Sequence, residues 1–435
     1  MSSRIIFSIV LLLTIAAIIT AGVNLIMSDS VVLADSELRP PSGPVPKTFF
    51  GMHRHVWPKR PEPWPDIPIG SFRMWDAATG WAQINTGPGK YDWQQIDQWF
   101  HDLQEHGVED VLYTFGRTPQ FASSQPNDDR CGYEPGSCDP PRDLNPDGSG
   151  PNQYWKDFVT AIVTHSKNNR GIHIKYWELW NEPYIMPHMW TGTIPQLLRM
   201  ARDARDIIHS IDPDAVFLTP PCGLQHDKFR QFMDDYLAAG GGQYADGIAF
   251  HGYVHAPAPA TDFIQYYEEF RKILKKYGQD SKPTFDTEAS WGNTRKAGLE
   301  DDDEYQAAFM TQFYLVQWSL GVKRLYWYAY NDGATGKLWN REERTQNKAA
   351  RAYRHLFEWM VGSTMTKACV PDGGVWTCGF TRPDGREALV VWTEGGEKSY
   401  TPKATLKKCT DVEGHESAIA GPLKVGRMPL FLEAK

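Results

Sequence analysis

The sequence predicts a (β/α)8 barrel followed by a small antiparallel β-domain. Eight short apolar runs typical of β-strands alternate with amphipathic helical stretches, several of which end at Gly, a common helix stop. After Gly362 the helical patterns cease, and short β-like runs separated by turns take their place. These observations predict a (β/α)8 barrel, large enough to be a catalytic domain, over residues 48–362 and a β-domain over residues 363–435.

The predicted barrel strands follow one another through the first of these regions. They are residues 48–53, 70–75, 111–115, 174–180, 215–219, 247–251, 283–288 and 324–330. A long polar loop, residues 123–152, follows the third strand. Loops after strands form the active face of a barrel, so this loop is expected to wall the cleft. Its acidic residues match no EF-hand spacing, which favours a solvated loop over a calcium site.

The N-terminus reads as an export segment. Residues 5–27 carry no charge, and Val32-Leu33-Ala34 has the small residues of a cleavage site after Ala34. The apolar run is also long enough, at about 20 residues, to span a bilayer uncleaved. We therefore expect residues 1–34 to be a signal peptide or an N-terminal membrane anchor, followed by a Pro-rich linker over residues 35–47. Either reading places the bulk of the protein outside the cytoplasm, secreted or anchored.

Composition narrows the class of partner. The formal net charge is -8 and no basic stripe is present, which argues against nucleic acid. The 17 Trp residues suit either a core or stacking on sugar rings. Six Cys fit an oxidising compartment, and the absence of a CxxC pair or a His-rich cluster favours disulfides over a metal site. Cys131 and Cys138 are predicted to be joined, while the pairing of Cys222, Cys369, Cys378 and Cys409 stays open.

Two predicted strands end in glutamates. The fourth ends in Asn181 and Glu182, and the seventh carries Glu288 at its end. Strands four and seven lie across the mouth of a barrel from each other, where such enzymes perform their chemistry. One carboxylic acid facing one carboxylate fits glycoside hydrolysis. The alternatives are a helix cap for the Asn-Glu-Pro segment and a buried Arg partner for Glu288, but the two glutamates together favour the catalytic interpretation.

These motifs also resemble a known group of enzymes. WNEP after the fourth strand and TE at the end of the seventh are similar to clan A glycoside hydrolases. FGMHRHVWP, FRMWDAATGWAQI and PGKYDWQQIDQW resemble the family 39 branch most, and the resemblance covers residues 48–435. It implies that Glu182 is the general acid/base and Glu288 the nucleophile. Two carboxylates suffice for that reaction, so no metal or organic cofactor is expected.

The resemblance implies roles for residues near the pair. Asn181 is placed to bind the sugar 2-OH, and Arg73, near the end of the second strand, to contact the nucleophile. A structural alternative pairs Arg73 with Asp76 or Asp286. Asp286 shares strand parity with Glu288, and a buried partnership with Arg73 suits it better than catalysis.

Further candidates follow the sixth, eighth and first strands. His251 and Tyr253 lie in an HGY segment, where Tyr253 resembles the tyrosine that donates to the nucleophile; packing in the cleft is its alternative role. Trp327 resembles the aromatic floor of the sugar subsite, with a core role as the alternative. One of His53 and His55 is expected to face the cleft.

Three more residues complete the set. Trp75 and Trp291 are candidate walls of the sugar site. Glu178 shares strand parity with Glu182 but lies four residues deeper, and it reads as a buried structural acid without an identified partner.

The sequence thus predicts a secreted retaining glycosidase that acts by double displacement. The rivals are a transglycosylase with the same nucleophile and a catalytically dead carbohydrate-binding barrel. Xylan, glucan, mannan and an exopolysaccharide are all candidate substrates, with exo or endo action. Oligomeric state is not predicted.

Overall fold

The computed structural model describes residues 38–55, 63–331 and 336–435. Leu38–Lys435 forms one compact unit. The predicted signal or anchor, residues 1–34, lies outside the described residues. Within the described ranges, no helix is long and apolar enough to cross a membrane.

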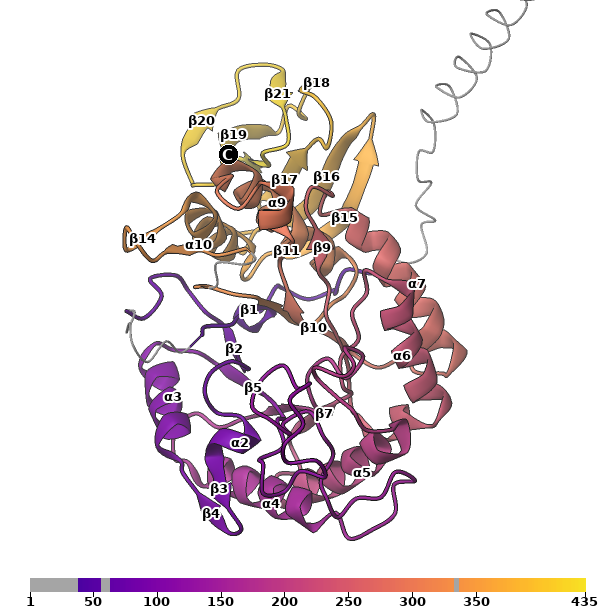
Figure 1. The fold of residues 1–435 in the computed structure, drawn as a ribbon. Helices are drawn as coiled ribbons and strands as arrows, with labels where there is room; N and C mark the ends of the chain where they lie inside the picture. The colour runs from indigo at the N-terminus through magenta and orange to yellow at the C-terminus, as the bar shows by residue number, and fades with distance from the viewer. Residues whose placement is uncertain (1–37, 56–62, 332–335) are drawn as a thin grey trace, which may run out of the picture. The chain divides into compact units, whose positions relative to one another are not determined.

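Eight parallel strands form the barrel (Figure 1). They are β1 (Phe50–Met52), β2 (Ser71–Met74), β5 (Asp110–Thr114), β6 (Tyr176–Glu178), β7 (Val216–Leu218), β8 (Ile248–Phe250), β10 (Thr284–Ala289) and β12 (Leu325–Trp327). Their order is β7-β6-β5-β2-β1-β12-β10-β8, and a parallel bridge between Leu218 and Gly247 joins the two ends. Each strand overlaps one of the predicted runs, and the predicted (β/α)8 barrel is confirmed.

Helices surround these strands (Figure 1). The long ones are α3 (Gln94–Glu105), α4 (Gln153–Asn168), α5 (Ile194–Ile211), α6 (Asp227–Ala238), α7 (Asp262–Lys276), α9 (Asp303–Ser319) and α10 (Lys348–Met360). A capping box between Thr193 and Gln196 starts α5, since each side chain bonds the other residue's backbone N–H. Asp302 caps α9 in the same position by accepting from the Tyr305 N–H.

Short elements decorate the barrel. They are α2 (Trp81–Ile84), α8 (Thr294–Ala297), η1 (Lys47–Phe49), η2 (Gly241–Tyr244), and the two-stranded pairs β3 (Asn85–Gly87) with β4 (Lys90–Tyr91), β9 (Val254–His255) with β11 (Trp291–Gly292), and β13 (Trp339–Asn340) with β14 (Thr345–Gln346). The pair β9 and β11 lies directly beyond β8 and β10. It therefore ties together the loops that follow these two barrel strands.

The C-terminal region is an antiparallel β-domain, as predicted. Its main sheet has the order β15-β16-β17-β22-β19-β20, and β18 pairs with β21. The bounds are β15 (Thr364–Asp372), β16 (Val375–Thr381), β17 (Glu387–Trp392), β18 (Lys398–Tyr400), β19 (Leu406–Thr410), β20 (Glu416–Ala418), β21 (Leu423–Val425) and β22 (Leu430–Ala434). A disulfide between Cys369 and Cys378 joins β15 to β16, whereas Cys222 and Cys409 are buried free thiols.

The β-domain is fixed to the barrel through α9 and α10. Every residue of α9 from Gln306 to Ser319 is buried, as expected of a helix covered on all sides. The Ser319 hydroxyl accepts from the Cys369 N–H at 3.0 Å, and the Trp359 indole on α10 donates to Glu433 at 2.8 Å. Val45, in the segment expected to be a linker, is also buried and bridges Val361, so the end of that segment belongs to the fold.

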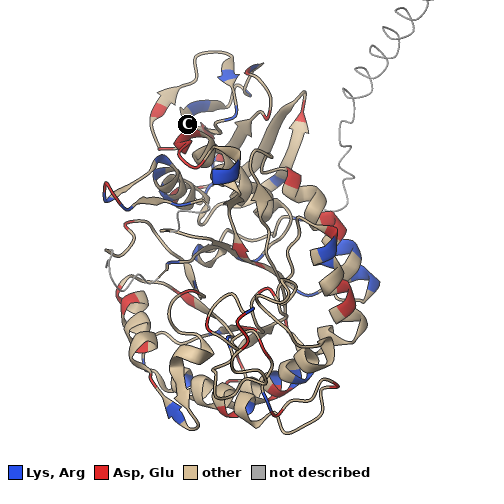
Figure 2. Cartoon of the chain, in the orientation of Figure 1, with Lys and Arg blue, Asp and Glu red and all other residues tan. Residues whose placement is uncertain are grey.

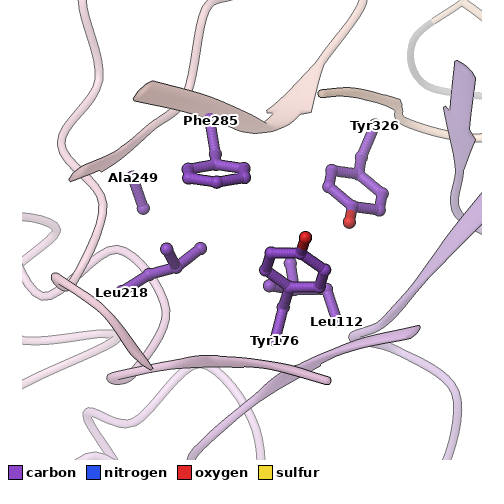
Figure 3. Packing of buried hydrophobic residues seen from close by; sticks show 6 residues of the cluster. All are labelled: Leu112, Tyr176, Leu218, Ala249, Phe285 and Tyr326. Atoms are coloured by element: carbon purple, nitrogen blue, oxygen red, sulfur yellow. The ribbon is translucent and has the colours of Figure 1, made fainter. Parts of the chain in front are cut away.

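The barrel interior below the strand ends is apolar (Figure 3). Six strands each contribute one buried side chain, namely Leu112, Tyr176, Leu218, Ala249, Phe285 and Tyr326. We call this set the apolar plug. Tyr176 precedes Glu178 on β6 and Phe285 precedes Glu288 on β10, so the plug lies on the amino-terminal side of the polar residues of the same strands. Side chains fill a small barrel in layers, and this layer supports the polar one above it.

Charged residues of both signs are spread over the outer helices (Figure 2). Acidic residues also lie among the strands and loops at the centre of the barrel. Carboxylates inside a barrel are costly to bury unless they are paired. The acidic residues at the centre of the barrel are therefore candidates for a functional site.

Candidate active site

The segment after β6 presents Glu182 through an unusual backbone. Trp180 and Glu182 both adopt the left-handed conformation, with φ of 65° and 45°. Such values are uncommon for residues with a Cβ and cost conformational energy. The Trp180 indole N–H donates to the Met189 carbonyl at 2.7 Å, which anchors the turn. The strand thus ends in a sharp, fixed turn that points Asn181 and Glu182 toward the barrel axis.

Glu288 reaches the barrel interior because β10 is irregular. The pairing of β10 with β12 shifts register between Asp286 and Ala289. Phe285 belongs to the apolar plug, whereas Asp286 faces away from it, accepting hydrogen bonds from Gln317 on α9 and from the Gly252 N–H. The expectation that Asp286 pairs with Arg73 is therefore wrong. Strand parity fails here because the register of β10 shifts between Asp286 and Ala289, the interval that contains Glu288.

Arg73 lies at the centre of a buried network. It donates from Nη1 to Glu288 Oε2 at 2.7 Å, and from Nε and Nη2 to Glu178 Oε2 at 3.0 and 2.6 Å. Nη2 also donates to Asn181 Oδ1 at 2.7 Å. The alternative pairings of Arg73 with Asp76 or Asp286 are thus excluded. Glu178, predicted as a structural acid without an identified partner, binds Arg73.

The Arg73 guanidinium stays charged although it is buried. Burial alone would lower the pKa of Arg73, but the Glu178 and Glu288 carboxylates raise it above its usual range. Glu178 also accepts from the Thr114 hydroxyl at 2.7 Å. One guanidinium therefore joins the ends of β2, β6 and β10 and holds Glu288 in place.

Glu288 has further donors on its other oxygen. The Tyr253 hydroxyl donates to Oε1 at 3.0 Å, and His251 Nδ1 lies 3.9 Å from the same atom. Burial raises the pKa of Glu288, while His251 and Arg73 oppose that rise. Tyr253 thus stands where the sequence comparison with clan A enzymes expected a donor to this carboxylate.

Glu182 is held by two donors of its own. Its Oε1 accepts from the Tyr184 hydroxyl at 2.6 Å and from His251 Nδ1 at 2.8 Å. Burial raises the pKa of Glu182; the Tyr184 hydrogen bond and Arg73 oppose the rise, and Asp76 adds to it. Burial also lowers the pKa of His251 to about 4. The imidazole is therefore neutral. Among the described residues its buried Nε2 has no hydrogen-bond partner, so we assign the proton to Nδ1, where Glu182 accepts it.

The two glutamates face each other at short range. One carboxylate oxygen from each, together with a His251 ring nitrogen, lies within 4.8 Å of the others. Retaining glycosidases hold their carboxyls about 5–5.5 Å apart, and inverting ones about 6.5–9.5 Å apart. The Glu182 and Glu288 side chains remain 13% and 8% exposed, so neither is completely enclosed. Two facing carboxyls at this range can serve as an acid and a nucleophile.

Three groups of described residues have the donor types and spacing that could hold a metal ion. The first is Glu182, His251 and Glu288, which Arg73 already neutralises in part. The second contains Cys131 and Cys138, whose sulfurs are bonded to each other and so are not thiolates. The third, His101, Asp102 and Glu105, lies on the surface of α3.

Asp76 lies at the centre of a second polar cluster. From the sequence it is considered only as an alternative partner of Arg73. It follows β2 with a left-handed φ of 54°. Its oxygens accept from the Tyr133 hydroxyl at 3.1 Å and the Tyr328 hydroxyl at 2.9 Å, and His55 Nε2 lies 3.9 Å away. Burial raises the pKa of both tyrosines, and the charges of Asp76 and Glu288 add to the rise.

Tyr133 comes from the long polar loop after β5. The residue lies between Cys131 and Cys138, whose predicted disulfide is confirmed. The guanidinium of Arg117 lies 3.9 Å from the Tyr133 ring centroid and 5.7 Å from that of Trp75. The loop therefore supplies a side chain to the mouth of the barrel, next to the candidate wall Trp75.

The two histidines after β1 differ in placement. His53 is fully buried and its Nε2 lies 3.0 Å from the Thr287 carbonyl, while burial lowers its pKa well below the usual value. His55 is 13% exposed beside Asp76, and its ring centroid lies 5.1 Å from that of Tyr328. Of the pair, His55 is the more exposed, and His53 is buried against the β10 backbone at Thr287.

Trp327 and Trp291 are completely buried. The Trp327 indole donates to the Gly336 carbonyl at 2.7 Å, and Trp291 stacks on Tyr305 with a centroid distance of 4.4 Å. Both rings pack within the barrel wall. Their contact with a sugar, as floor and as wall, stays a prediction.

Sequence reasoning missed Tyr184 and the Asp76 cluster. Tyr184 is two residues after Glu182, outside any strand, so no periodicity predicts where its ring points. Tyr133 and Tyr328 reach Asp76 from loops after two different strands. The only signal was position, because all of them follow barrel strands, where functional residues gather.

Comparisons with known proteins give the fold a context. No model of a known protein family and no curated protein matches this sequence. Among solved structures, a family 39 glycoside hydrolase from Bacteroides cellulosilyticus is 18% identical, with a TM-score of 0.66 over 91% of this chain and 81% of that one. A family 39 β-xylosidase from Caulobacter crescentus is 16% identical, with a TM-score of 0.63 over 92% of this chain and 98% of that one.

A third structure comes from another family. The family 30 subfamily 8 xylanase of Clostridium acetobutylicum is 13% identical, with a TM-score of 0.58 over 92% of this chain and 97% of that one. At such identities the likeness establishes the fold. Over barrel and β-domain together, the match covers 91–92% of this chain and 81–98% of the three structures.

Proposed function

We propose that this protein is a retaining glycoside hydrolase that cleaves O-glycosidic bonds in a poly- or oligosaccharide. The observation that carries the proposal is the pair of carboxylate oxygens from Glu182 and Glu288 within 4.8 Å across the barrel mouth. That spacing suits direct attack by one carboxylate and is shorter than the separation of about 6.5–9.5 Å typical of inverting enzymes. The fold shared with family 39 and family 30 glycoside hydrolases supports it.

In the first step Glu288 attacks the anomeric carbon while Glu182 gives its proton to the leaving oxygen. The bond from the anomeric carbon to that oxygen breaks as the bond to Glu288 forms. Arg73 and Tyr253, both hydrogen-bonded to Glu288, stabilise its ionised form before attack. Among the described residues no Arg hydrogen-bonds to Glu182, which makes it the better candidate for the protonated form.

In the second step water replaces Glu288. Once Glu288 is esterified its negative charge is gone, and the pKa of Glu182 falls. Glu182 then takes a proton from the water that attacks the anomeric carbon, and Glu288 leaves as a carboxylate. Two inversions restore the original configuration.

Asn181 is proposed to bind the sugar 2-OH. Its side-chain oxygen accepts from Arg73 Nη2 at 2.7 Å, which leaves the amide nitrogen as the donor. Contacts to the 2-OH strengthen in the transition state of glycoside hydrolysis. Arg73 thus sets the orientation of this amide as well as that of Glu288.

Other contacts with the sugar are proposed for residues around the pair. Trp75 would wall the site, while the completely buried Trp327 and Trp291 would support the lining beneath and beside the sugar. His251 would hold Glu182 in place for the reaction through their hydrogen bond, and His53 would steady β10 through its contact with the Thr287 carbonyl. The two disulfides favour an oxidising, extracytoplasmic location.

The test is a screen followed by stereochemistry. Purified protein is assayed on xylan, glucan, mannan and exopolysaccharide, with and without added acceptor sugars. Proton NMR then records the anomer formed first on the best substrate. We expect the retained anomer; an inverted first product refutes double displacement. Transfer to acceptor in place of hydrolysis identifies a transglycosylase, and binding without turnover a dead barrel.

A further inference from the structure

We infer that Tyr184 is a positioning residue for Glu182. Together with His251 it donates hydrogen bonds to Oε1 of Glu182, so that Oε2 is the oxygen that exchanges a proton with the substrate. This rests on the proposed function, in which Glu182 is the acid/base. It goes further by naming the carboxylate oxygen that works and the side chain that selects it.

The geometry at Glu182 separates its two oxygens. The Tyr184 hydroxyl at 2.6 Å and His251 Nδ1 at 2.8 Å both donate to Oε1. Among the described residues, none forms a hydrogen bond with Oε2, although the side chain is only 13% exposed. An oxygen that accepts two hydrogen bonds is less basic than one that accepts none. The proton of the neutral acid therefore belongs on Oε2.

Tyr184 is itself held on two sides. Its ring packs against Phe229 on α6, with a centroid distance of 4.6 Å. On the other side lies Gly223, where an added Cβ would come within 3.0 Å of the Tyr184 hydroxyl. A side chain at position 223 would crowd the Tyr184 hydroxyl, whereas glycine does not. The hydroxyl is thus confined to the place where it meets Glu182.

Tyr184 acts as a donor and not as a second acid. Burial and the neighbouring Glu182 raise its pKa well above the usual range, so its proton stays in place through both steps. In the first step the Oε2–H bond breaks as the glycosidic oxygen takes the proton. In the second step a water proton bonds to Oε2. Oε1 keeps both its donors throughout.

A pH profile separates this role from a structural one. The titratable or charged groups that affect Glu182 are Tyr184, His251, Glu288, Arg73 and Asp76. The Tyr184 hydrogen bond lowers the pKa of Glu182, so its loss raises that pKa. In Tyr184→Phe the basic limb of kcat/KM should move to higher pH, because Glu182 stays protonated longer.

The experiment measures kcat/KM against leaving-group acidity, which reports the first step alone. The probes are 2,4-dinitrophenyl and methyl glycosides of xylose, glucose and mannose in both anomeric forms. For Tyr184→Phe we expect a loss of about tenfold with the methyl leaving group, which needs protonation, and less than about threefold with dinitrophenolate, which does not. Tyr400→Phe, in the β-domain, is the matched control and should change neither.

Tyr184→Ala tests whether ring packing matters instead. It should show the same dependence on leaving group, with a lower melting temperature because the contact with Phe229 is lost. An equal loss for both leaving groups in Tyr184→Phe, or an unmoved basic limb, overturns the inference. Failure of the proposed function looks different, because the wild-type protein would then hydrolyse none of the probes and Glu288 would not be labelled by 2-deoxy-2-fluoro glycosides.

Discussion

The two levels of the barrel interior are built on the same strands and hold opposite kinds of side chains. On β6, Tyr176 belongs to the apolar plug, and Glu178, two residues later, binds Arg73. On β10, Phe285 belongs to the plug, and Glu288 binds both Arg73 and Tyr253. On β6 the apolar layer and the layer of buried charges are thus only two residues apart.

The difference shows a division of labour. Burying the plug removes apolar surface from water and stabilises the fold. The upper layer buries carboxylates and a guanidinium and places Trp180 and Glu182 in left-handed conformations, which costs stability. Changes in the upper layer should affect activity most, and changes in the plug should affect stability most.

The largest effect is expected in the upper layer. Glu288→Gln should lower kcat by about 10⁴-fold or more, as loss of a catalytic residue commonly does, while the fold is kept. A glycosidase assay with circular dichroism measures both quantities. Glu416→Gln, on exposed β20, is the control with the same chemical change. Activity close to wild type would remove Glu288 as the nucleophile.

In the plug the expected pattern is reversed. Phe285→Ala should lower the free energy of unfolding by about 3–5 kcal/mol, because it leaves a cavity in a packed interior. Denaturant unfolding measures this, and kcat/KM of the folded fraction at low temperature should stay near wild type. If activity fell while stability held, the division between the levels would be contradicted.

A smaller effect is expected at the rim. Asp76→Asn keeps a residue type that tolerates the left-handed backbone but replaces one carboxylate oxygen with an amide group. One of Tyr133 and Tyr328 then loses its charged acceptor, and we expect a loss of about 1 kcal/mol in unfolding free energy. Asp372→Asn, on β15, is the control. A stability equal to wild type would show that these hydrogen bonds contribute nothing net.

The smallest effect should depend on pH. Burial raises the pKa of Glu182 in the folded protein above its pKa in the unfolded chain. Protonated Glu182 therefore contributes fully to the free energy of unfolding below the unfolded pKa, and this contribution is lost as pH rises through the folded pKa. Glutamine mimics the protonated form at every pH. Glu182→Gln should therefore raise the melting temperature at pH 7 and leave it unchanged near pH 4. A pH-independent difference would contradict this origin.

The strands and both glutamates could be predicted because they depend on local pattern. Alternating β and helical runs identify a barrel, and residues at the ends of its strands face the mouth. Arg73 was placed correctly at the end of β2, but its partner was not. The error over Asp286 arose from a register shift in β10, which is a property of strand pairing that one sequence does not display.

The contacts of Tyr184 and Asp76 could not be predicted for a related reason. Each depends on where a loop side chain points after the whole barrel has closed. Tyr184 meets Glu182 only because Phe229 and Gly223 confine it. Asp76 meets Tyr133 only through the path of a long insertion.

That insertion has a consequence for how such an enzyme could be altered. The Cys131–Cys138 disulfide and a bridge between Ser123 and Pro141 tie the first part of the loop together, and the Arg142 N–H donates to the carbonyl of Ala122, just before the loop begins. Residues 123–142 thus form a closed loop that carries Tyr133 to the mouth of the barrel, and backbone hydrogen bonds from Gly132 to His188 and from Thr191 to Cys138 hold it against the segment after β6. Natural variation or protein engineering could exchange this loop as one unit and change the side chains beside Trp75, without altering Glu182 or Glu288.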